Sequence, residues 1–298
     1  MATDPALPRA MSNRRGLPQR DYTLKRSRYR ALCLLIALTA GARMAAGQGS
    51  GKDSVVRDPH AVQPERPTVA THAGTVARGW VELEEGGEWD KSTDGTRSFT
   101  APTNLKIGLG SRTQLNVMLN LLRAAKVRGG NLSFGDLTIG VKYRIVDGDR
   151  LLGDFAILPA LKFPTGQESA GAGTGTTDFS LLLISSRQLG PVAMDLNIGA
   201  TSRSGDGSRA PIASKVWTAS FGFPVLGNLA WVAELFGYPR TTGIAATAAF
   251  LTGPTFTARD WLAFDAGVIA PITGAQPKAA YAGLVWNLGC LLPRGRCR

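Results

Sequence analysis

Two long runs of alternating side chains, joined by a tight turn, constrain the fold more than any other part of this sequence. In residues 137–145 every second side chain is large and apolar, and the residues between are Thr, Gly, Lys and Arg; residues 151–163 alternate in a similar way. Asp147–Arg150 separates the runs with Asp and Gly, which suit a hairpin turn. A period of two puts alternate side chains on opposite faces of a strand. Each run reaches about ten residues or more, enough for a tilted strand to cross a bilayer.

The same alternation recurs along the chain and predicts twelve strands. We expect them at Thr75–Trp89, Thr96–Leu109, Thr113–Leu122, Ser133–Val146, Leu151–Phe163, Thr176–Leu189, Val192–Ser202, Val216–Phe223, Leu229–Phe236, Ile244–Thr257, Leu262–Ala270 and Ala279–Leu288. Tight turns alternate with longer loops, as in outer-membrane barrels. We therefore predict an all-β fold over residues 75–288, a transmembrane antiparallel β-barrel of bacterial outer-membrane type with both ends in the periplasm. The alternative is a soluble two-sheet sandwich.

The two ends of the chain lie outside the predicted barrel. Four basic residues in 25–30 precede the apolar run Ala31–Ala42, and small residues precede Gln48. This order predicts that residues 1–47 are a cleaved leader or signal peptide, and the alternative is an uncleaved anchor helix. Residues 48–74 are polar and contain three prolines, which predicts an extended periplasmic segment. Residues 289–298 form a C-terminal tail.

Charge, cysteines and histidines narrow the function classes. The net charge is +12, but nine Lys and Arg against two Asp stand in residues 1–47, so no nucleic-acid partner is predicted. Cys33 lies in the predicted leader, whereas Cys290 and Cys297 in the tail form either a disulfide or two free thiols. His60 and His72 precede the first strand and no ligand spacing appears, so we predict no catalytic residues, no cofactor and no metal site. An outer-membrane lipid-modifying enzyme is the weaker alternative.

Charged residues on the inward parity are the candidates for lining a pore. They are Glu82, Glu84, Lys106, Lys142, Arg144, Asp154, Lys162, Asp195, Glu234 and Asp265. Such charges can line a wet channel that selects solutes, or they can pair with each other and plug the lumen. The four cations would form a positive stripe along the wall. The glycine-rich loop Pro164–Gly175 has the freedom to fold in and narrow the mouth.

Several motifs resemble known outer-membrane proteins. The stretch Tyr281–Leu288 resembles the assembly signal of bacterial outer-membrane barrels, which implies the barrel-assembly machinery as a partner, although this chain continues for ten residues beyond it. The sequences GDLTIGVKYR at 135–144, LKFPTG at 161–166 and TTDFS at 176–180 resemble the family catalogued as putative MetA-pathway of phenol degradation, over about residues 66–288.

That resemblance implies a protein of the bacterial outer membrane that works as a channel or transporter. Its partners would be outer-membrane lipid and a small-molecule solute, taken up passively, with small organic and even aromatic compounds as the expected class. The resemblance brings no catalytic residues. The alternative function is a structural or adhesive barrel with a plugged lumen.

Overall fold

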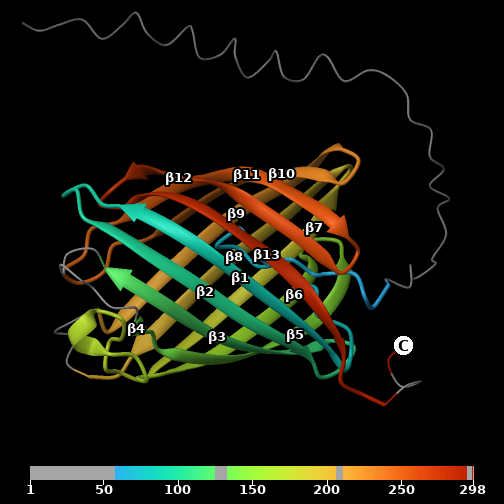
Figure 1. Cartoon of the computed structure of the whole chain (residues 1–298), viewed down its shortest axis with the longest axis horizontal. Helices are drawn as coiled ribbons and strands as arrows, with labels where there is room; N and C mark the ends of the chain where they lie inside the picture. The colour runs from blue at the N-terminus through green and yellow to red at the C-terminus, as the bar shows by residue number, and fades with distance from the viewer. Residues whose placement is uncertain (1–57, 125–132, 206–210, 294–296, 298) are drawn as a thin grey trace, which may run out of the picture. The chain divides into compact units, whose positions relative to one another are not determined.

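The computed structural model describes residues 58–124, 133–205, 211–293 and 297, and these form a closed antiparallel barrel (Figure 1). The long strands are β1 (Trp80–Lys91), β2 (Arg97–Gly108), β3 (Thr113–Ala124), β5 (Leu137–Asp149), β6 (Gly153–Phe163), β7 (Asp178–Leu189), β8 (Val192–Arg203), β9 (Ala213–Leu226), β10 (Leu229–Tyr238), β11 (Thr247–Arg259), β12 (Leu262–Thr273) and β13 (Lys278–Cys290). The two-residue β4 (Ser133–Phe134) pairs only with β3. Pairing of β1 with β13 closes the sheet, so the predicted twelve-strand barrel is confirmed and the open sandwich is wrong.

Connection lengths alternate between the two ends of the barrel. The turns at residues 109–112, 150–152, 190–191, 227–228 and 260–261 lie at the end where β1 begins and β13 finishes (Figure 1), which we call the turn end. The connections at the opposite, loop end are mostly longer, and one of them contains the 3-10 helix η1 (Glu168–Ala170). None of the described residues forms a helix long and apolar enough to span a membrane. The predicted leader, residues 1–47, lies outside the described residues.

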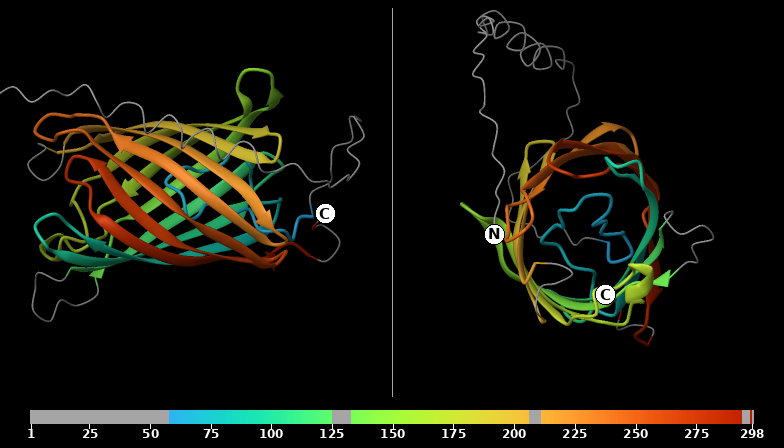
Figure 2. Two further views of the ribbon diagram at one scale, coloured as in Figure 1. Left: turned by 90° about the horizontal axis from the view of Figure 1, so that it is seen from above. Right: turned by 90° about the vertical axis from the view of Figure 1, so that its left-hand side faces the viewer.

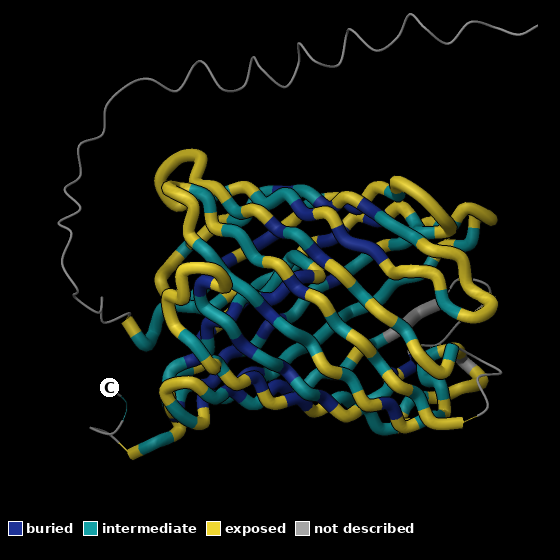
Figure 3. The backbone as a smooth tube through the Cα atoms, turned by 180° about the vertical axis from the view of Figure 1, so that it is seen from behind, coloured by how far each residue is buried: buried dark blue, intermediate teal, exposed yellow. Residues whose placement is uncertain are grey.

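Side chains alternate between lipid and lumen as the sequence predicts. On β5, Val141 and Tyr143 are exposed on the outer surface, whereas Lys142 between them is fully buried. The burial-coloured trace shows this alternation over the wall (Figure 3). An apolar outer face suits hydrocarbon, and the closed ladder satisfies the backbone polar groups that lipid cannot. The strands therefore direct their alternate apolar side chains towards the membrane and their alternate charged side chains into the lumen.

The chain before β1 enters the barrel. Residues 58–79, here called the lumenal segment, lie inside the lumen in the view along the axis (Figure 2). We predicted an extended periplasmic segment over 48–74, and this is wrong for its described part, residues 58–74. The physical reason is that the segment pairs with no strand, so its N–H groups need other acceptors, and the inward-facing wall supplies them.

A disulfide lies close to the start of β1. Cys290 and Cys297 are disulfide-bonded with their Cα atoms 6.2 Å apart, so of the two alternatives for these cysteines the structure has the bonded one. The backbone N–H of Leu291 donates to the carbonyl of Gly79 over 2.8 Å. The tail therefore contacts the residue where the lumenal segment passes into the wall.

Candidate functional site: the occupied lumen

The wall holds the main chain of the lumenal segment through side-chain acceptors. The Glu234 carboxylate on β10 accepts from the backbone N–H groups of Val69 over 2.8 Å and Ala70 over 2.7 Å. The Asn197 amide on β8 accepts from the N–H of Thr71 over 2.7 Å and donates to its carbonyl over 2.9 Å. Glu234 and Asn197 are buried, so these bonds satisfy wall side chains that water does not reach.

The same arrangement continues along the segment. Four further backbone N–H groups donate to side chains of the wall over 2.6–2.8 Å: Gln63 to Glu82, Glu65 to Glu84, Ala73 to Ser186 and Val76 to Gln114. Their acceptors stand on β1, β3 and β7, so the segment is held from several sides. Between its two ends the segment thus bonds its backbone N–H groups to side chains of the wall, where a strand would bond them to a neighbouring strand.

A buried charge network ties the segment to strands β1, β2 and β5. The Lys106 ammonium lies 2.5 Å from the Glu82 carboxylate and 2.8 Å from that of Glu84. The Lys142 ammonium pairs with Glu65 of the segment and donates to the His72 carbonyl over 3.0 Å. Both lysines are fully buried. Charges that leave water need partners of this kind, because an unpaired buried charge is strongly destabilising.

Two ionisable groups of the lumenal segment titrate away from their ordinary range. Burial opposes ionisation of Glu65, but the ammonium groups of Lys142 and Lys106 outweigh burial and hold the pKa of this carboxyl below its usual value. Burial, helped by the positive charge of Lys142, lowers the pKa of His72 to about 3. At neutral pH the docked segment therefore carries an ionised Glu65 and an uncharged His72.

Arg66 makes a second ion pair between the segment and the wall. Its guanidinium lies 3.3 Å from the carboxylate of Asp265 on β12, with side chains that are 14% and 4% exposed. Asp265 is one of the predicted inward acids. Its partner was not predicted, because Arg66 belongs to a stretch that we placed outside the barrel.

At the loop end, Lys162 of β6 has its own acidic partners. Its ammonium lies 2.8 Å from Asp136 and 3.0 Å from Asp178. Asp136 also accepts from the backbone N–H groups of Gly166 and Thr174, each over 3.0 Å. The loop Pro164–Gly175 is thus fastened to the barrel by this carboxylate.

Arg144 and Asp154 lie away from the segment's ion pairs. Arg144 pairs with Asp147 over 2.7 Å and Asp154 accepts from the N–H of Gly148 over 2.8 Å, both near the β5–β6 turn. Asp195 accepts from the Ser186 hydroxyl over 2.5 Å. The four cations of the predicted stripe are therefore each paired with a carboxylate.

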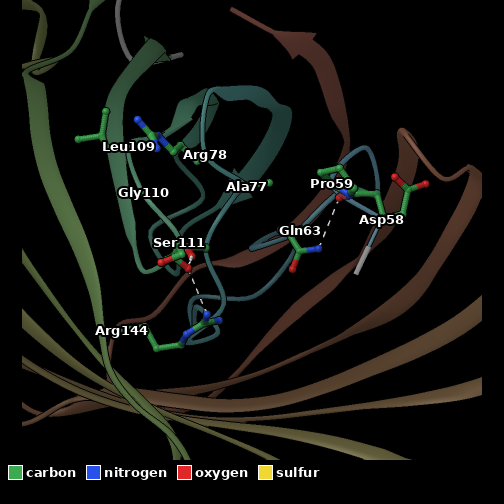
Figure 4. A pocket seen from close by; sticks show the side chains of 11 residues that line it. Asp58, Pro59, Gln63, Ala77, Arg78, Leu109, Gly110, Ser111 and Arg144 are labelled. Atoms are coloured by element: carbon green, nitrogen blue, oxygen red, sulfur yellow. Dashed lines mark hydrogen bonds between the residues drawn. The ribbon is translucent and has the colours of Figure 1, made fainter. Parts of the chain in front are cut away.

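Arg144 also borders a cavity of about 690 Å³ at the turn end (Figure 4), between the segment and the β2–β3 turn.

Part of the lumen is apolar, which the parity argument did not predict. Inward residues of β10–β13 form a buried cluster: Phe236, Ala249, Leu251, Ile269, Ala279 and Tyr281. A second cluster joins Ala73 of the segment to Ala156, Leu158 and Ile184. Sequence reasoning also missed the uncharged acceptors Gln114, Asn197 and Ser186 as site residues, although polar side chains on the inward parity were the available signal.

Comparison with known proteins agrees with the architecture. The family model described as "Putative MetA-pathway of phenol degradation" matches residues 65–276, and the chain belongs to this family. An outer membrane channel from Pseudomonas putida F1 is similar in structure, with a TM-score of 0.57 at 13% identity over 74% of this chain and 100% of that chain. The KdgM porin gives a TM-score of 0.48 at 9% identity over 69% and 98% of the two chains. No curated protein sequence matches. Fold and family place the chain in the bacterial outer membrane.

Proposed function

We propose that this member of the phenol-degradation MetA-pathway family is an outer-membrane channel for the passive uptake of small organic solutes, aromatic ones among them, and that the lumenal segment is its gate. One observation carries the proposal: the middle of the segment is bonded to side chains of the wall and does not pair with the backbone of any strand. In the described residues 58–79 no residue belongs to a strand. The segment can therefore leave without breaking the ladder that closes the barrel.

The cost of opening is consistent with a gate. Each side-chain bond to the segment's backbone can be exchanged for a bond to water, so its net contribution is about 0.5–1.5 kcal/mol for an uncharged acceptor and about 1.5–3 kcal/mol for a carboxylate. The charged groups Glu65 and Arg66 would be rehydrated as they leave. An opening that exchanges bonds in this way is far less costly than separating two strands in lipid, where no water replaces the lost partners.

The inner surface supports small organic solutes. The apolar cluster that includes Phe236, Leu251 and Tyr281 offers aromatic and aliphatic contact near the loop end, on β10–β13. The buried charges of β1, β2 and β5 lie closer to the turn end. A solute with an apolar body and a polar group would meet contacts of both kinds along the lumen.

The test is the conductance of the reconstituted protein in planar bilayers, with the swelling of solute-loaded liposomes as a second measurement. The complete chain should conduct weakly, and a variant lacking residues 58–74 should conduct far more, because the occupied lumen is then free. Retained β content by circular dichroism is the control for folding. If the shortened variant stays closed to ions and solutes, the structural or adhesive barrel with a plugged lumen is correct.

Two further predictions about the ends of the chain belong to the proposal. We propose that residues 1–47 are removed on export, which mass analysis of protein from outer membranes would test, and that Tyr281–Leu288 engages the barrel-assembly machinery. We assign no enzymatic role. The ring centroids of His60 and Trp80 lie 5.2 Å apart. Among the described residues no group of His, Cys, Asp and Glu is placed to hold a metal.

A further inference from the structure

We propose that Arg66 is the latch of the lumenal segment, and that two facing glycines of the wall, Gly86 and Gly283, form a seat that only its guanidinium fills. The proposal rests on the gate proposed above and deepens it, because it names the contact whose release would open the lumen. It concerns a contact on β1, β13 and β12, apart from the lysine network on β1, β2 and β5.

The seat is formed where the barrel closes. Gly86 on β1 and Gly283 on β13 are directly opposite in register. A Cβ atom on Gly86 would lie 2.3 Å from Cζ of Arg66, and one on Gly283 would lie 2.5 Å from its Nε. Non-bonded atoms do not approach so closely, so any side chain at either position displaces the guanidinium. Glycine inside a strand weakens the strand and often marks a close approach, here by Arg66.

Asp265 completes the seat from the third strand. It stands opposite Gly283 in the β12–β13 register, and its two carboxylate oxygens accept from Nε and Nη2 of Arg66, each over 3.3 Å. The guanidinium therefore lies across three adjacent strands. Lys cannot reproduce this contact, because its point charge lacks the planar fork.

The geometry also makes this contact looser than the lysine pairs of the wall. Its two bonds of 3.3 Å are at the long end of the hydrogen-bonding range, whereas Lys106 lies 2.5 Å and 2.8 Å from its carboxylates. The Arg66 side chain is 14% exposed and Lys106 is fully buried. Arg66 also stands three residues before Val69, where the bonds to Glu234 begin. Its release therefore removes an ion pair of the segment that stands just before these bonds.

The test uses single-channel recordings of the complete chain carrying Gly86→Ala, Arg66→Gln or Asp265→Asn. Each should raise the open probability about tenfold, the size expected for loss of a charge-assisted hydrogen bond. Gly222→Ala is the matched control: this glycine lies on β9, and an added Cβ would meet its nearest neighbour, Cβ of Ala193, at 3.9 Å. We leave Gly283 unchanged because it belongs to the predicted assembly signal.

A double variant separates a latch from general weakening of the wall. If the glycine seats the guanidinium, Gly86→Ala should add nothing in the Arg66→Gln background. An equal effect of Gly86→Ala in both backgrounds, or none in either, overturns the proposal. If Gly86→Ala does not fold, Arg66→Gln and Asp265→Asn decide, since neither places a Cβ on the two glycines. Each must open the channel, and together no more than singly.

Hydrogen exchange gives a readout that does not depend on conduction. The amides of Val69, Ala70 and Thr71 should exchange about tenfold faster in Arg66→Gln than in the unchanged chain, and at the unchanged rate in Gly222→Ala. Faster exchange without conduction would retain the latch and refute the channel. Unchanged exchange in a chain whose segment-deleted form conducts would refute the latch and retain the channel.

Discussion

Two sides of the lumen make different kinds of contact: one is charged and the other is apolar. The charged side consists of Glu82, Glu84, Lys106 and Lys142 with Glu65 of the segment, and the apolar side is the cluster of Phe236, Leu251 and their neighbours on β10–β13. Charged contacts demand a partner with defined geometry, whereas apolar contacts depend on area alone. The charged side therefore fixes the position of the segment, and the apolar side can accept molecules of many shapes.

Removing a buried charge should have the largest effect. Lys106→Met leaves Glu82 and Glu84 without their cation, so the free energy of unfolding should fall by about 3–5 kcal/mol. Urea unfolding in lipid vesicles measures it. Lys106→Arg keeps the charge and should recover part of the loss. If Lys106→Met is as stable as the unchanged chain, the network is not what stabilises this side.

A substitution on the apolar side should lower the free energy of unfolding by less, and it should not release the segment. Leu251 is 1% exposed, and Leu251→Ala removes packing without stranding a charge, so we expect a loss of about 2–3 kcal/mol, at the lower end for such changes. The same urea unfolding gives the stability. The open probability in single-channel recordings should stay as in the unchanged chain. A marked increase would mean that the apolar cluster also holds the gate.

Acid should act on the charged side through His72. His72 in the docked segment has its pKa lowered to about 3, whereas a released segment would titrate near the ordinary value of about 6.5. Below about pH 6.5 the released form binds a proton that the docked form refuses. Docking therefore weakens as pH falls from about 6.5 towards 3, by at most about 1.4 kcal/mol per pH unit.

Open probability recorded at pH 7 and pH 5 measures this effect. The groups that face His72 are Glu65, Lys142 and Lys106. The lowered pKa of Glu65 acts in the same direction, but only in more acidic solution. His72→Gln should remove most of the difference between the two pH values, and Leu251→Ala should leave it intact. Opening that increases with pH would contradict the assignment.

The smallest effect should come from a charge pair outside the lumen. Arg112 and Asp147 pair near the turn end with side chains 43% and 44% exposed. Water and salt screen such a pair, so Arg112→Gln should change stability by about 0–1 kcal/mol. The contrast with Lys106→Met in the same unfolding assay tests whether burial, and not charge itself, makes the charged side important.

The alternation of side chains predicted the barrel because a strand in lipid has no freedom to place its faces otherwise. It predicted the inward position of Lys142 and Glu234, and it predicted β9 too short because the alternation weakens beyond Phe223. The lumenal segment escaped prediction because it has no period and binds mainly through its backbone. One signal was present: the ten predicted lining residues include six acids and four cations, so the surplus acids needed donors from elsewhere.

The way the wall holds the segment has a consequence for how this protein can diverge. At Val69, Ala70 and Thr71 the bonded atoms are main-chain atoms, which every residue except proline supplies in full. Substitution of these three residues by others leaves the bonds in place. Substitution of Glu234 or Asn197 does not, because their side chains are the bonded groups. Among descendants of this gene we therefore expect the segment to drift in sequence while keeping its length, and the acceptors that face it to stay fixed.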